Sequence, residues 1–252
     1  MARYIAAGFV SLAFLFSYSI SYAASLPPEC RFETQLKNLE TAKKGVLEKD
    51  KASELTLRKG ILIKVVDCAF KDADTFEDAL SEMSAQNADL ELQEVYEGFS
   101  RQLENVFSHY KDEKLKIEKL DIDESKVFAK NLFEWRNIHY LPLAEKIANF
   151  MMWEKNQGLI KIAERRLSQI EQTLLALELT ENEDIKILFQ RGKTNLQYAQ
   201  VSSGRARQIF LLVNPPDDSL YLIRASLESL SETYRAFFNL SQAVKNAVLS
   251  NQ

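Results

Sequence analysis

The chain has 252 residues, with 32 lysines and arginines against 36 aspartates and glutamates, and its formal net charge is −4 at neutral pH. Apolar residues make up 46% and charged residues 27%, which excludes a disordered chain, a collagen and a polytopic membrane protein. The acidic balance gives no basic field, so we expect no nucleic-acid partner. Seven glycines and five prolines are few for this length and disfavour a turn-rich all-β fold.

The N-terminal segment, residues 1–23, indicates a secretory signal peptide. Arg3 supplies the positive start, an apolar run follows to Phe16, and small residues precede a cleavage site after Ala23. We therefore expect an exported protein, periplasmic or extracellular, with a mature domain over 24–252 and no membrane insertion after cleavage. The alternative is an uncleaved N-terminal helix that anchors the protein, because the apolar segment approaches membrane-spanning length.

Two cysteines, Cys30 and Cys68, lie at equal distances in sequence from Lys49, 19 residues on either side. The polar residues around Lys49 separate two segments with helical periodicity. If the chain reverses there, both cysteines lie roughly 28 Å along their helices and can meet. In an exported protein we expect this hairpin to be closed by a structural disulfide. The alternative, one continuous helix, would hold the cysteines about 57 Å apart.

Beyond the hairpin, Thr75 and Asp78 have the spacing of a capping box and predict that a new helix begins after Asp74. A polar break at 84–87 separates its first turns from the next segment. Acidic side chains in this region are interpreted as charges that favour a helix N-terminus through the helix dipole. They are Asp72, Asp74, Glu77, Asp78 and Glu82.

A stronger amphipathic segment follows, with apolar residues at three- and four-residue steps from Leu92 to Tyr110. Asp121 is expected to lie in a turn and to cap a shorter helix. Pro142 is expected to end or kink that helix, because proline has no backbone N–H and disfavours a helical residue before it. The helical pattern resumes after Pro142 and runs to about Leu179.

Thr180 and Glu183 form a capping-box pair for a helix that we expect to run to about Val213. Its inward positions recur at steps of three or four residues, and several are small enough to admit a close neighbour. These positions are Ile185, Phe189, Gly192, Leu196, Ala199, Ser203, Ala206, Phe210 and Val213. Two prolines then stop the helix, and an aspartate after them caps a last helix with a similar stripe.

No run of alternating apolar and polar residues is long enough to predict a sheet. Long helices with short connections pack as antiparallel neighbours. We therefore predict an all-α fold, an elongated antiparallel bundle of long amphipathic helices with coiled-coil-like seams. The bundle forms one domain, or two that divide near Asp121.

Motifs for catalysis and metal binding are missing from the sequence. The two histidines, His109 and His139, each follow a glutamate by five residues. Residues at this spacing lie about 140° apart on a helix, so neither pair can hold one ion. The chain also lacks a nucleophile elbow and a phosphate-binding loop. We expect no metal, no cofactor and no enzymatic activity.

Two sets of residues are candidates for a functional surface. The first lies beside the expected helix break and combines aromatic rings with cations, as ligand or partner surfaces do; it consists of Trp135, Arg136, His139 and Tyr140. The second could receive an anion or an acidic partner; it consists of Arg191, Lys193, Arg205, Arg207 and Arg224. The simpler interpretations are a capped core end for the first set and a solvated helix face for the second.

These observations favour an exported, non-enzymatic helical-bundle protein that acts as a protein–protein interaction or structural module. Its partner is an unknown protein or a second copy of the chain. The alternative is a small-ligand-binding or sensor-like bundle with a pocket near Trp135, His139 and Tyr140. A third hypothesis is an exported enzyme whose site is built from scattered residues.

Overall fold

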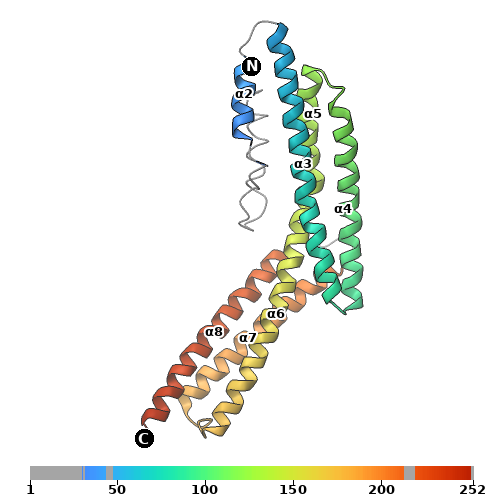
Figure 1. Cartoon of the computed structure of the whole chain (residues 1–252). Helices are drawn as coiled ribbons and strands as arrows, with labels where there is room; N and C mark the ends of the chain where they lie inside the picture. The colour runs from blue at the N-terminus through green and yellow to red at the C-terminus, as the bar shows by residue number, and fades with distance from the viewer. Residues whose placement is uncertain (1–29, 31, 44–47, 213–218, 251–252) are drawn as a thin grey trace. The chain divides into compact units, whose positions relative to one another are not determined.

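A computed structural model describes residues 30, 32–43, 48–212 and 219–250. Regular structure in these residues is helical throughout and includes no strand, so the predicted all-α fold is confirmed (Figure 1). The expected signal peptide lies outside the described residues. Within them, no helix combines the length and apolar character that crossing a membrane requires.

The chain divides after Ala148 into two compact units, and Asp121 lies inside the first. The first unit contains α2 (Glu33–Lys43), α3 (Glu48–Gln86), α4 (Leu90–Ile117), α5 (Ile122–Trp135), the π-helical turn η2 (Arg136–Tyr140) and the first residues of α6 (Leu141–Ala176). The second unit contains the rest of α6, α7 (Glu183–Phe210) and α8 (Ser219–Ser250).

The predicted N-terminal hairpin is present. Helix α2 packs against α3, and Cys30 and Cys68 form a disulfide with their Cα atoms 5.8 Å apart. Lys49 lies in the first turn of α3, and residues 44–47 between the two helices lie outside the described residues. Both cysteines are buried with Phe32 and Leu39.

Helix α3 continues through Asp74, so the predicted helix start at that residue is wrong. The hydroxyl of Thr75 donates to the carbonyl of Lys71 at 2.9 Å, as a threonine inside a helix does. The helix continues because its buried apolar positions recur on both sides of Asp74, with Ala73 and Leu80 fully buried. The acidic side chains of this segment therefore lie along the helix and not in its first turn.

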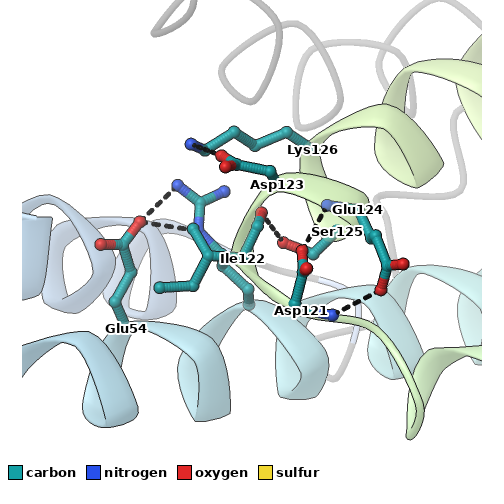
Figure 2. A network of polar contacts seen from close by, with 8 residues as sticks. Glu54, Asp121, Ile122, Asp123, Glu124, Ser125 and Lys126 are labelled. Carbon is teal, nitrogen blue, oxygen red and sulfur yellow. Dashed lines mark hydrogen bonds and ion pairs between the residues drawn. The ribbon is translucent and has the colours of Figure 1, made fainter.

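The other expected breaks in the first unit are confirmed at Gln86 and Asp121. Helix α3 ends at Gln86, and Asp89 caps α4 by accepting from the backbone N–H of Glu91 at 3.1 Å. Asp121 caps α5 in a complete capping box: its carboxylate accepts from the N–H of Glu124, and the Glu124 carboxylate accepts from the N–H of Asp121 (Figure 2).

Of the two outcomes expected at Pro142, an end of the helix is wrong, because the chain remains helical on both sides of it. In η2, directly before this proline, the N–H of Leu141 donates to the carbonyl of Arg136, five residues back. A π-helical turn holds one more residue than an α-helical turn. Proline has no backbone N–H, so Pro142 cannot make the hydrogen bond of a regular α-helix. The π-helical turn shifts the hydrogen-bond register just before this position.

Helices α6, α7 and α8 pack around a shared apolar core in the second unit. Part of this core consists of Ile160, Ala163, Leu196, Ala199 and Leu230. Helix α7 begins at Glu183 with Asn182 as its cap, so the capping role predicted for Thr180 is wrong. The Asn182 side chain takes this role because it can reach the N–H of Ile185, at 3.2 Å.

Small side chains on the inner face of α7 allow close packing, as predicted. The expected inward positions are buried apart from Phe189, which is half-buried, and Val213, which lies outside the described residues. The prolines and aspartates expected between α7 and α8 also lie outside them. Buried polar contacts also cross the core. The indole of Trp153 donates to the carbonyl of Ser203 at 2.9 Å, and Asn156 donates to the hydroxyl of Ser226 at 2.7 Å.

Gly192 and Gly204 provide a matched test of the packing between α7 and α8. A Cβ atom at Gly192 would lie 3.0 Å from the ring of Phe237, whereas one at Gly204 would meet no atom within 4 Å. We expect Gly204→Ala to raise the free energy of unfolding by up to about 1 kcal/mol through helix propensity. The free energy of unfolding of Gly192→Ala should be about 1–2 kcal/mol lower than that of Gly204→Ala, because the ring of Phe237 must move to admit the methyl group. Urea unfolding measures both, and equal stabilities would contradict the close approach.

The disulfide gives a second test, in the first unit. Cys30→Ser combined with Cys68→Ser should lower the free energy of unfolding by about 4 kcal/mol, because the open chain gains loop entropy in the unfolded state. Thermal unfolding with and without reductant measures the effect. Reductant should lower the melting temperature of the wild-type protein and leave that of the double variant unchanged. A wild-type melting temperature insensitive to reductant would contradict a structural role.

Candidate functional site

The π-helical turn η2 carries the first set of candidate residues. The side chains of Arg136 and Tyr140 are directed into the first unit, with 4% and 0% of their surfaces exposed, whereas His139 is exposed and Trp135 is half-buried. Turns of this kind are rare and occur frequently at functional sites. The structure therefore splits the predicted set into an inner pair and an outer pair.

The inner pair meets a carboxylate from α3. The Tyr140 hydroxyl donates to Oδ2 of Asp72 at 2.8 Å, and Nη2 of Arg136 lies 3.6 Å from the same oxygen. The Arg136 guanidinium also lies 4.8 Å from the centre of the Tyr140 ring, which is a cation–π distance. A charge that would be costly to bury alone is thus paired within a polar cluster of Asp72, Arg136 and Tyr140.

Tyr110 from α4 completes this cluster. Its ring is 1% exposed and meets the edges of the Trp135 and Tyr140 rings at 5.4 and 6.2 Å. Burial raises the pKa of Tyr110 to about 12, against the opposing effect of the nearby Arg136. Burial, reinforced by the charge of Asp72, also raises the pKa of Tyr140. Both hydroxyls therefore stay protonated at neutral pH and do not act as bases.

The outer pair forms an aromatic stack with His109 of α4. The imidazole of His109 lies against the indole of Trp135, with ring centres 3.6 Å apart and planes 16° from parallel, and His139 lies 5.3 Å from the same indole. Burial lowers the pKa of His109, which keeps this ring neutral at neutral pH. The stack meets the inner residues through Trp135, whose ring contacts that of Tyr110.

Members of the second candidate set lie on α7 and α8. Arg191, Lys193, Arg205 and Arg224 are exposed, and Arg207 is half-buried. Residues two apart on a helix point about 200° apart, so Arg191 and Arg205 share one face of α7 while Lys193 and Arg207 lie on another. The five cations therefore do not form a single patch.

A groove that the sequence analysis missed lies between α6 and α8 in the second unit. Its volume is about 540 Å³, and apolar side chains make up much of its lining, among them Ile170, Leu174 and Phe238. The guanidinium of Arg166 lies 5.1 Å from the centre of the Tyr234 ring at this groove. Phe237 and Phe238 are adjacent, so when Phe237 fills the core its neighbour must point outward, and Phe238 is 64% exposed. Two adjacent phenylalanines on an amphipathic helix are therefore the feature of the sequence that indicates this groove.

The sequence analysis also missed three polar residues. Sequence spacing places Asp72 among first-turn charges and Tyr110 in an apolar stripe, whereas in the structure both belong to the cluster at η2. Arg58 of α3 is 1% exposed and donates twice to Oε1 of Glu54, at 2.6 and 2.8 Å. The two dashed lines from Glu54 in Figure 2 mark these contacts. A spacing of four residues between opposite charges was the signal for this pair.

Tyr110→Phe tests the polar cluster through pH. Because the folded state holds the pKa of Tyr110 at about 12, above its ordinary value of 10, the resulting stability is complete below pH 10 and is lost as the pH rises toward 12. The phenylalanine ring cannot ionise, so this variant should lose about 1 kcal/mol less stability than the wild type between pH 9 and pH 11. Urea unfolding at each pH measures the difference. Tyr198→Phe is the control, because Tyr198 is exposed. If both variants lose the same stability between pH 9 and pH 11, the buried position of Tyr110 is contradicted.

Among the described residues, no three side chains of histidine, cysteine, aspartate or glutamate are grouped so that they could hold a metal ion. Comparisons with models of protein families, with curated proteins and with solved structures found no match. The function is therefore inferred from the geometry of the two units.

Proposed function

We propose that the protein is an exported helical-bundle protein that acts by binding another protein through its second unit. The apolar groove between α6 and α8 carries this proposal. Apolar side chains that a monomer leaves exposed together are typical of interaction sites. The disulfide and the N-terminal sequence support export, because structural disulfides form in oxidising compartments.

The groove has the composition of a protein-binding surface. Its lining residues extend from Arg166 to Leu174 on α6 and from Tyr234 to Val244 on α8, which corresponds to about 15 Å along α8. Aromatic and arginine side chains contribute most to binding at protein interfaces, and both kinds are present. Polar side chains such as Gln169 and Ser241 accompany them. This pattern suits a partner helix laid along the groove.

The first unit supports a binding role over a catalytic one. A catalytic acid or base must change its protonation state near neutral pH. The tyrosine hydroxyls of the cluster at η2 stay protonated there, and the carboxylate of Asp72 is already paired with Arg136 and Tyr140. These contacts join α3, α4 and η2 and hold the three elements together.

A small-ligand-binding role is the second candidate function, and the size of the same groove favours it. A volume of about 540 Å³ is within the range of small-molecule sites. The groove lies in the second unit, so this candidate site differs from the pocket expected near Trp135. A small ligand would need the groove to enclose it, whereas a helix needs it open along its length.

The test places a photo-crosslinking amino acid at Phe238 in the groove, and separately at Tyr221, which is exposed on the same helix and does not line the groove. The full chain is expressed in the organism that carries its gene. We expect a discrete protein adduct from position 238 and none from position 221. Ile170→Glu should remove the adduct by placing a charge in the groove. No protein adduct, with a small molecule retained in native mass spectrometry, would instead support the second candidate.

A further inference from the structure

Helix α7 carries a second stripe of side chains on the face opposite its core. We call it the outer seam of α7; it consists of Ile187, Arg191, Thr194, Tyr198, Val201 and Arg205. Ile187, Tyr198 and Val201 are 57%, 62% and 52% exposed. The steps between members are four, three, four, three and four residues. A helix that packs on one face only has no need of an ordered second stripe.

The outer seam has the repeat of a coiled coil. Ile187, Thr194 and Val201 recur every seven residues, and so do Arg191, Tyr198 and Arg205. This spacing brings both series onto one line along the helix, where each side chain can insert between four residues of a facing helix. A hollow of about 410 Å³ lies along the first half of this line. Its lining includes Ile187, Arg191 and Thr194 of the seam, together with Glu183, Lys186, Gln190 and Asn195.

The charge of α7 restricts what can lie on this seam. From Ile185 to Phe210 the helix has no acidic residue, although the chain as a whole is acidic. Its cations are Lys186, Arg191, Lys193, Arg205 and Arg207. Within the described part of the chain, neither Arg191 nor Arg205 takes part in an ion pair.

Pairing of the seam with a second copy of itself is unfavourable. In a parallel pair in register, Arg191 faces its own counterpart. In an antiparallel pair centred on Tyr198, Arg191 faces Arg205, because both lie seven residues from the centre. Either arrangement places like charges opposite each other, which disfavours association. The seam therefore fits a different helix with opposite charge.

We propose that the outer seam of α7 binds an acidic amphipathic helix of a partner protein, with carboxylates opposite Arg191 and Arg205. The inference goes beyond the proposed function, because it assigns a second binding surface, on α7, and names the chemistry of the helix that binds there. The two arginines are fourteen residues apart, about 21 Å along the helix, so the partner carries two carboxylates two heptads apart. The arginine stems pack on its apolar residues while their guanidinium groups reach the carboxylates.

The test uses two synthetic amphipathic peptides of three heptads. Both have the same apolar seam, with glutamates two heptads apart in one and lysines at the same positions in the other. Fluorescence anisotropy measures their binding to the mature chain. We expect the wild-type protein to bind the glutamate peptide at least tenfold more tightly than the lysine peptide. Arg191→Glu combined with Arg205→Glu should reverse this preference.

Lys193→Glu combined with Arg224→Glu is the matched control, because it makes the same charge change in the same unit at two exposed positions outside the seam. We expect it to weaken binding of the glutamate peptide less than threefold. Equal weakening by both double variants would mean general charge attraction and would overturn the inference. Light scattering that shows a dimer dissociated by Val201→Glu would also overturn it, since a second copy would then occupy the seam.

The peptide test and the crosslinking test can fail separately. If the wild-type protein does not bind the glutamate peptide while position 238 still gives a protein adduct, the inference about α7 is wrong and the proposed function stands. If neither experiment detects a protein partner, the proposed function fails as well. Circular dichroism of each variant shows that the fold is retained, because all of the substituted side chains on α7 are exposed.

Discussion

Close packing of α7 against its neighbours is the constraint on which the second unit depends. A methyl group at Gly192 would lie only 3.0 Å from the ring of Phe237, and Ala199, Ser203 and Ala206 continue the same small-residue face. A helix held this closely on one face has its rotation about its own axis set. The face that carries Tyr198 and Val201 must then point to solvent. The exposed seam is therefore a consequence of the buried one.

Buried polar contacts add specificity to apolar cores in both units. In the first unit, Asp72, Arg136 and Tyr140 join α3 to η2, and Tyr110 packs against them from α4. In the second, Asn156 donates to Ser226, whose hydroxyl donates in turn to the carbonyl of Ala199. A sliding helix would leave such groups without partners, at a cost in free energy. These contacts hold the helices in one register and thus give each surface a defined shape.

Periodic features of the sequence predicted the fold well, because a buried stripe needs only local spacing. Local spacing was enough to predict the inner face of α7, the N-terminal hairpin and the cap at Asp121. Local signals failed where tertiary packing decided between alternatives. Thr75 has the spacing of a cap, but Leu80 continues the buried face of α3 through it.

The candidate site was predictable only in part. The aromatic segment before Pro142 was recognised as unusual, but the π-helical turn that directs Arg136 and Tyr140 inward depends on their partners in α3 and α4. The groove at Phe238 required knowledge of which helices are neighbours. By contrast, the separation of Arg191 from Lys193 onto different faces follows from helix geometry alone. Grouping the cations by sequence distance therefore concealed the seam.

The central claim is that α7 buries one face and leaves the opposite face free. Single cysteines introduced along α7 of the folded protein, each treated with a maleimide, test it most directly, since both native cysteines are bonded to each other. The labelling rate should rise and fall with the helical period, high at positions 198 and 201 and low at 199 and 203. Equally fast labelling at all positions, or slow labelling at positions 198 and 201 in the isolated protein, would contradict the claim that this face of α7 is exposed.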